Sequence, residues 1–182
     1  HIEIKNQTSP SHSQIDNVLV LYSNGQIQEA LDAIAVLAKS YPNDALLYNI
    51  SGACYQILGQ QDTAISSYEK ALAIKPDFAE AHNNLGNTFK ALGQLDTAIK
   101  HYEAALVIKP DLVDTHNNLG NALQELGQLD AAVKSYEKAL FFKSDLAEIH
   151  NNHGNALKEL RQLDAAVQSY EKALAIKPEF IG

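Results

Sequence analysis

The sequence predicts an all-α fold, a solenoid built from antiparallel helix pairs. Three observations support this prediction: small and aromatic residues recur every 34 residues, apolar residues within each copy follow helical spacing, and glycine or proline interrupts the pattern at fixed points. The recurring sets are Gly52, Gly86, Gly120 and Gly154; Ala64, Ala98, Ala132 and Ala166; Tyr68, Tyr102, Tyr136 and Tyr170; and Ala71, Ala105, Ala139 and Ala173. Because such self-similarity is typical of stacked supersecondary units, we expect function to lie on an extended surface rather than in one catalytic cleft.

Residues 79–112 show how one unit is built. The first apolar face has helical spacing and ends before Gly93, a residue suited to the left-handed position that closes a helix. A second apolar face follows, and Pro110 cannot continue it. The first face consists of Ala81, Leu85, Phe89 and Leu92, and the second of Leu95, Ala98, Ile99, Tyr102, Ala105, Leu106 and Ile108. We therefore expect two antiparallel helices of about 14 residues each, with Gly86 and Ala98 small because helix backbones approach closely there.

The positions of these residues resemble the tetratricopeptide repeat (TPR) family. The residues that carry the resemblance in this unit are His82, Leu85, Gly86, Phe89, Ala98, Tyr102, Ala105 and Pro110. The resemblance implies a right-handed superhelical α-solenoid. It covers a single array at residues 11–180, made of a divergent copy at 11–44 and strong copies at 45–78, 79–112, 113–146 and 147–180, and it leaves residues 1–10 as a flexible tail or tag remnant.

Several departures from the pattern gather around the last copy. His153 stands where the family has leucine, Arg161 where other copies have glycine, and Ser144 where they have proline. We expect a less abrupt link at Ser144, and we expect copy 147–180 to be the least stable of the strong copies. Phe141 and Phe142 replace Ala-Ile or Val-Ile, which predicts an exposed Phe141 beside a buried Phe142.

Charge and composition exclude several classes of partner. A net charge of −8 argues against nucleic acid and against anionic membrane surfaces, both of which attract basic proteins. The single cysteine, Cys54, allows no internal disulfide and reads as a buried filler, which fits a reducing, cytoplasmic compartment. No apolar run approaches the roughly 20 residues that span a bilayer. The chain has no methionine and begins at His1, so we expect an excised segment of a longer protein.

Asparagine forms three rows on the first helix of each pair. The rows are Asn49, Asn83, Asn117 and Asn151; Asn84, Asn118 and Asn152; and Asn87, Asn121 and Asn155. Asparagine is mediocre inside a helix because its side chain competes for backbone hydrogen bonds. Regularly spaced amides can pair with the backbone of an extended peptide, since each offers two donors and an acceptor. The alternative is structural: the same amides can hydrogen-bond between neighbouring helices and hold the stack together.

The asparagine rows resemble the superhelical TPR region of O-linked N-acetylglucosamine transferase and its bacterial relatives. That resemblance implies a ladder of amides that holds a substrate backbone, at Asn84, Asn118 and Asn152, with the third row as secondary candidates. Ile50 interrupts the ladder in the first strong copy, and no transferase domain is present. An acidic row of Glu80, Asp114 and Glu148 disfavours the family's basic clamp for terminal carboxylates and favours ligands with Lys or Arg.

The remaining polar residues suggest no chemistry. His82, His116 and His150 lie one repeat apart, too far to share a metal ion, so we expect core packing and no metal or cofactor. The leading hypothesis is a non-catalytic protein–protein interaction module that binds an extended peptide or protein segment. The second is the substrate-recognition arm of a larger enzyme, and the third is a scaffold that self-associates through its ends. The uncovered face of the last helix, with Val167, Tyr170, Leu174 and Ile176, favours such end-to-end contact.

Overall fold

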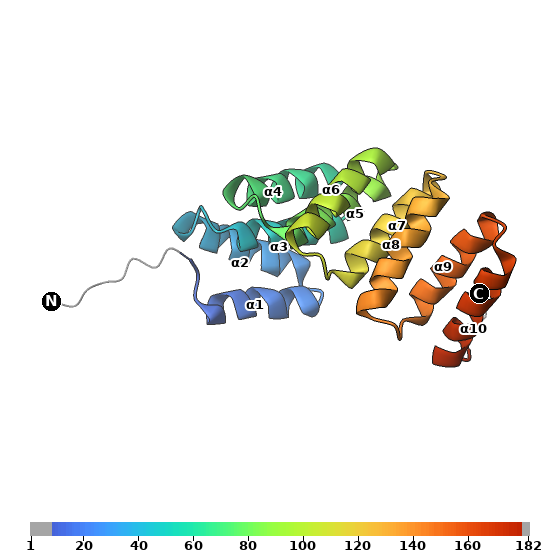
Figure 1. Ribbon diagram of the computed structural model, residues 1–182. Coiled ribbons are helices and arrows are strands. Elements are labelled where there is room, and N and C mark those ends of the chain that lie inside the picture. The colour runs from blue at the N-terminus through green and yellow to red at the C-terminus, as the bar shows by residue number, and fades with distance from the viewer. Residues whose placement is uncertain (1–8, 180–182) are drawn as a thin grey trace. The chain divides into compact units, whose positions relative to one another are not determined.

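The chain folds as five consecutive helix pairs. The computed structural model describes residues 9–179, and within these residues it contains ten α-helices and no strand (Figure 1). The helices are α1 (His12–Ser23), α2 (Ile27–Ser40), α3 (Ala45–Ile57), α4 (Gln61–Ile74), α5 (Ala79–Ala91), α6 (Leu95–Ile108), α7 (Val113–Glu125), α8 (Leu129–Phe142), α9 (Ala147–Glu159) and α10 (Leu163–Ile176). The predicted all-α architecture and the predicted helix lengths are confirmed. The N-terminal tail, expected at residues 1–10, lies almost wholly outside the described residues.

The helix boundaries follow from local chemistry. Ser11 and Gln14 form a reciprocal capping box at the start of α1, and the Asp44 carboxylate accepts a hydrogen bond from the Leu47 N–H at the start of α3. Gly93 has a φ of +72°, which is the left-handed conformation expected between the two helices of a pair. Arg161 adopts the same conformation without being glycine, with a φ of 60°.

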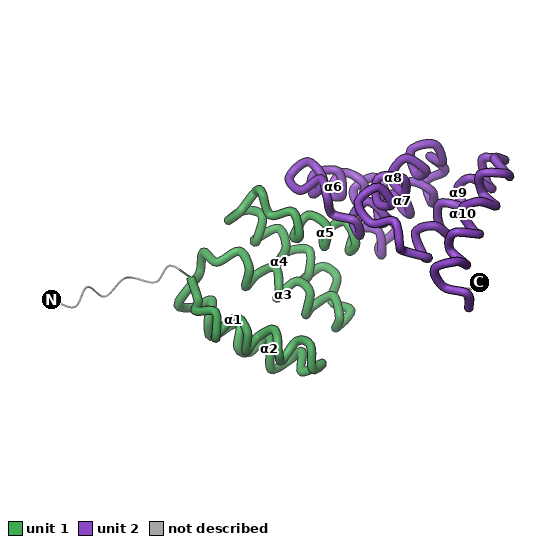
Figure 2. Tube along the Cα trace, turned by 60° about the horizontal axis from the view of Figure 1, so that its bottom comes forward, with its two compact units in different colours: residues 1–88 green, residues 89–182 purple. Residues whose placement is uncertain are grey.

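The chain divides into two compact units, residues 1–88 and 89–182, which Figure 2 draws in green and purple. The boundary falls inside α5, between Thr88 and Phe89. In the first unit, the main core lies among α1, α2 and α3 and includes Val18, Ile34, Leu47 and Cys54. Cys54 is fully buried, as predicted, and burial raises the pKa of its thiol to about 11.

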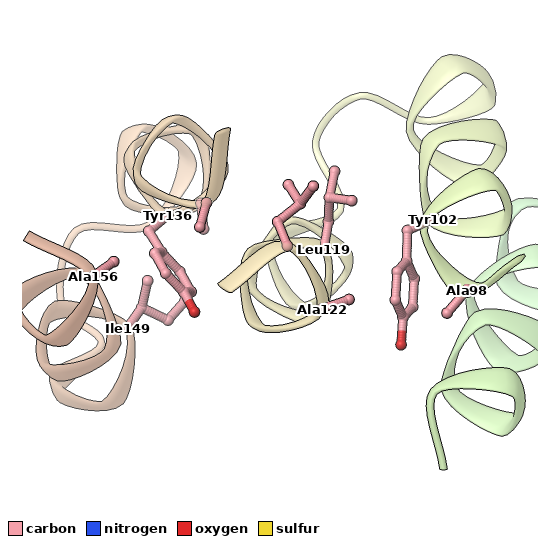
Figure 3. Close-up of a cluster of buried hydrophobic side chains, with 10 residues drawn as sticks. Ala98, Tyr102, Leu119, Ala122, Tyr136, Ile149 and Ala156 are labelled. Carbon is pink, nitrogen blue, oxygen red and sulfur yellow. The ribbon is translucent and has the colours of Figure 1, made fainter. Parts of the chain in front are cut away.

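Buried tyrosines fill the core of the second unit. Figure 3 shows Tyr102 between Ala98 on α6 and Leu119 and Ala122 on α7. In the same cluster, Tyr136 of α8 lies among residues that include Ile149 and Ala156 of α9. Both tyrosines are fully buried, so each ring joins one helix pair to the next.

The structure changes the explanation for one recurring glycine. We expected small residues because helix backbones approach closely, but Gly120 faces an aromatic ring instead. A Cβ atom at Gly120 would lie 2.6 Å from Cε1 of Tyr136, and a Cβ atom at Gly154 would lie 2.7 Å from Cε1 of Tyr170. The glycine is therefore required by the tyrosine that follows it 16 residues later.

Two of the recurring histidines form hydrogen bonds to the loops that connect successive helix pairs. The Nε2–H of His116 donates to the carbonyl oxygen of Pro110 at 2.9 Å, and the Nε2–H of His150 donates to that of Ser144 at 2.9 Å. The predicted less abrupt link at Ser144 is wrong, because α8 ends at Phe142 just as α6 ends at Ile108. The residue after each of these two helices has similar extended backbone angles, whether serine or proline follows it.

Two further expectations about aromatic and apolar exposure have different outcomes. Phe141 is 81% exposed, as predicted, but Phe142 is 42% exposed rather than buried and stacks on His116. The predicted uncovered face of α10 is present, with Val167 53% exposed and Leu174 44% exposed.

Candidate peptide-binding surface

The predicted asparagines lie on the first helix of each strong repeat. Those in the first unit lie on α3 and α5, and those in the second unit on α7 and α9. All ten are partly exposed: Asn49, Asn83, Asn84, Asn87, Asn117, Asn118, Asn121, Asn151, Asn152 and Asn155. None is fully buried, so each presents some polar surface while it also touches protein.

Two asparagines of the second row, Asn84 and Asn152, donate hydrogen bonds to those of the first row. In the first unit, Nδ2 of Asn84 donates to Oδ1 of Asn49 at 3.1 Å. In the second unit, Nδ2 of Asn152 donates to Oδ1 of Asn117 at 3.2 Å and, more weakly, to Oδ1 of Asn121 at 3.4 Å. These bonds join α3 to α5 and α7 to α9. The asparagines therefore help to hold neighbouring repeats together, which is the structural role given as the alternative to peptide binding.

Tyrosine hydroxyls orient the third row. The Tyr136 hydroxyl donates to Oδ1 of Asn121 at 2.7 Å and lies 3.0 Å from Oε1 of Gln124. The Tyr170 hydroxyl donates to Oδ1 of Asn155 at 2.8 Å. Burial raises the pKa of Tyr136 well above its usual value, so the hydroxyl keeps its proton and remains a donor. The bond therefore fixes which end of the Asn121 amide faces the core.

Two of these amides, those of Asn121 and Asn152, each have one end without a partner within the described chain. Among the described residues, Nδ2 of Asn121 and Oδ1 of Asn152 have no hydrogen-bond partner. Both side chains line a hollow of about 520 Å³ in the second unit, together with Lys90, Gln124, Glu125, Glu148 and Glu159. Asn83, Asn87 and Asn118 have interaction partners of their own. The hollow thus presents a free amide donor beside a free amide acceptor.

Charged residues surround these amides. Nζ of Lys90 lies 3.0 Å from Oε1 of Glu125, and the Gln124 amide donates to the Glu159 carboxylate. Glu148, from the predicted acidic row, lines the hollow, whereas Asp114 is exposed on α7 and does not line it. Glu80 lies in the first unit. Sequence reasoning missed Glu125 and Glu159, although their place at the same position of successive repeats was a signal that could have found them.

Comparison with known proteins decides the family. A family profile described as TPR repeat matches residues 52–93, 86–127 and 120–160, and one described as Tetratricopeptide repeat matches residues 147–180. The chain belongs to the tetratricopeptide repeat family. Membership supports a protein–protein interaction module, because TPR proteins are typically non-catalytic interaction modules.

Solved TPR structures share the fold. A crystal structure of MamA has a TM-score of 0.80 and 24% sequence identity, covering 87% of this chain and 93% of that one. The crystal structure of YrrB, described as a TPR protein with an unusual peptide-binding site, has a TM-score of 0.76 and 20% identity, covering 97% and 91%. A curated peroxisomal targeting signal receptor from Candida glabrata is 33% identical over 63 residues, which span 35% of this chain but only 11% of the receptor.

Two features are absent from residues 9–179 of this TPR chain. No helix there is long and apolar enough to cross a membrane. No group of three or more histidine, cysteine, aspartate or glutamate residues in that part of the chain is placed to hold a metal ion.

Proposed function

We propose that this chain is a non-catalytic module that binds an extended peptide or protein segment on its asparagine-lined surface. The observation that carries the proposal is that two asparagine amides use only one end for hydrogen bonds within the protein. The oxygen of Asn121 accepts from the Tyr136 hydroxyl, and the nitrogen of Asn152 donates to Asn117. The stack therefore holds each side chain in place and leaves the opposite end free.

The free ends match a peptide backbone. Nδ2 of Asn121 can donate to a carbonyl oxygen of the ligand, and Oδ1 of Asn152 can accept from an N–H of the ligand. Every backbone amide carries both groups, so this pairing is independent of the ligand's side chains. The described peptide-binding site of YrrB and the name of the targeting signal receptor support the same class of ligand.

An isosteric substitution tests the proposal. Asn121→Asp together with Asn155→Asp keeps the oxygens that accept from the tyrosine hydroxyls but removes the free donors. We expect the whole chain to lose retention of a pool of random, uncharged, end-capped peptides about twelve residues long, enough to cross both helices at about 3.3 Å per residue.

The control is Gln162→Glu together with Gln168→Glu, an equal change of charge at two exposed positions, the N-cap and the body of α10, and it should retain the peptides as the parent chain does. Retention by the double aspartate variant at the parent level would contradict the proposal. Alanine at Asn84, Asn118 and Asn152 is a less specific test, because it also removes bonds that join helices.

Self-association through α10 is a second candidate function. The face of α10 that carries Leu163, Val167 and Leu174 is 44–59% exposed at these residues, whereas the equivalent Val133 and Leu140 on α8 pack against the core cluster. Light scattering over a range of concentrations tests this idea: Val167→Lys should abolish any oligomer, and a parent chain that stays monomeric when concentrated would exclude it.

A substrate-recognition arm of a larger enzyme would use the same asparagine surface and makes the same prediction for Asn121.

A further inference from the structure

On α7 and α9, beside the hollow, asparagine amides lie between two carboxylate side chains. On α9, Glu148, Asn152, Asn155 and Glu159 follow i, i+4, i+7, i+11 spacing, which places them on one face of the helix. Glu148 is in the first turn and Glu159 is the last residue, so the two lie about 16 Å apart along the axis at 1.5 Å per residue. Helix α7 repeats the arrangement with Asp114, Asn118, Asn121 and Glu125.

The two acidic edges differ in what already neutralises them. At the C-terminal edge, Glu125 pairs with Lys90 and Glu159 accepts from Gln124. At the N-terminal edge, Glu148 is exposed and has no hydrogen-bond or ion-pair partner among the described residues. Lys90 is the one basic residue among those that line the hollow in the described part of the chain. The hollow therefore carries two carboxylates, Glu148 and Glu159, without a cationic partner.

We propose that the bound segment carries Lys or Arg side chains on both sides of its backbone. The inference rests on the proposed function, because the amides of Asn121 and Asn152 set the line along which the backbone runs. Successive side chains of an extended chain point in opposite directions. Two adjacent basic residues would therefore reach toward Glu148 on one side and Glu159 on the other.

Other side chains fit this surface less well. An acidic side chain would meet carboxylates at both edges, and like charges repel. An apolar side chain would find amides and carboxylates in place of an apolar wall, since seven polar residues line the hollow: Lys90, Asn121, Gln124, Glu125, Glu148, Asn152 and Glu159. The arginine fork also offers several donors to a carboxylate, which favours it over the ammonium of lysine.

Two peptide pools test the inference on the whole chain. Both contain end-capped random peptides without other charged residues, and they differ only in a fixed central pair, which is Arg-Arg in one pool and citrulline-citrulline in the other. We expect the chain to retain the arginine pool roughly 3- to 10-fold better at low salt, as two partly solvated ion pairs allow, and less so at high salt.

Matched variants identify the cause. Glu148→Gln with Glu159→Gln should remove the difference between the pools, whereas Glu103→Gln with Glu171→Gln, exposed carboxylates on α6 and α10, should preserve it. Equal retention of both pools by the parent chain would overturn the inference but leave the proposed function standing. Retention of neither pool would instead count against the proposed function itself. Loss of the difference in the control variant would show a general charge effect and also overturn the inference.

Discussion

Replacing His153 with leucine should stabilise the last repeat. Ser169 donates its only hydroxyl proton to the carbonyl oxygen of Ala165 at 3.1 Å, so its oxygen accepts from Nδ1–H of His153, also at 3.1 Å. This tautomer leaves Nε2 as a lone-pair acceptor, and that atom is buried without a partner in the described structure. A buried polar atom left unpaired costs about 1–3 kcal/mol.

The preceding repeat supplies the template for the substitution. There, Leu119 occupies the equivalent position, and Ser135 donates to the carbonyl oxygen of Ala131 at 3.0 Å, as Ser169 does to its own helix. Leucine at position 153 removes the unpaired nitrogen and one neutral hydrogen bond worth about 1 kcal/mol. We expect a net gain of about 1 kcal/mol, or a rise of about 2–4 °C in Tm for a chain of this length if it unfolds cooperatively.

The same substitution should alter the dependence of stability on pH. Burial, with smaller effects from His150 and Lys172 against Glu137, lowers the pKa of His153 below 6.5. Because the folded pKa lies below the unfolded one, the stability contributed by neutral His153 is fully present above pH 6.5 and is lost as pH falls from there through the folded pKa. The advantage of the leucine variant should therefore grow on acidification.

Thermal and urea unfolding followed by circular dichroism, at neutral pH and near pH 5.5, measure both effects. The converse variant, Leu119→His, should lose stability, because it places the polar ring at a site where the leucine is only 7% exposed. A Tm for His153→Leu that is unchanged or lower than that of the parent chain would refute the reasoning.

Three further substitutions test local features of the repeats, each by urea unfolding. Arg161→Gly should raise stability by about 0.5–1 kcal/mol, because it relieves a φ of 60° at some cost in the entropy of the unfolded chain; a loss would show that the arginine side chain matters more than the backbone. Gly120→Ala should lower stability by about 1–2 kcal/mol, because the new Cβ would overlap the ring of Tyr136, and an unchanged midpoint would mean that the ring moves aside freely. Tyr136→Phe should cost about 1 kcal/mol through the lost bond to Asn121, and it should also weaken peptide retention; normal values of both would contradict the assigned role of the hydroxyl.

Much of the fold could be predicted because the repeat makes every local signal appear several times. Gly93 and Pro110 mark ends that the structure confirms, since both act through the backbone of their own residue. The reason for Gly120 could not be predicted, because it depends on a ring from the next helix. The prediction at Ser144 was wrong for a related reason: α8 ends at Phe142 and Lys143 is extended although no proline follows, and the loop is held by the bond from His150 to the Ser144 carbonyl oxygen, which the local sequence does not reveal.

The sequence also placed the asparagines on the right helices but could not divide their roles. A helical period shows which residues share a face, and it placed Asn121 and Asn152 in two rows on the first helices of successive copies. Only the structure shows that Asn121 turns its oxygen to Tyr136 while Asn152 turns its nitrogen to Asn117.

The sequence by itself therefore determined the repeat, its helices and the face on which the amides lie, because these follow from periodicity within a single chain segment. The tertiary structure decided which end of the Asn121 and Asn152 amides is free and which carboxylates lie beside them. The free end of each of these amides depends on hydrogen bonds between residues that are 15 or 35 positions apart in sequence and lie on different helices. A local sequence pattern gives the residue type but not its hydrogen-bond partner.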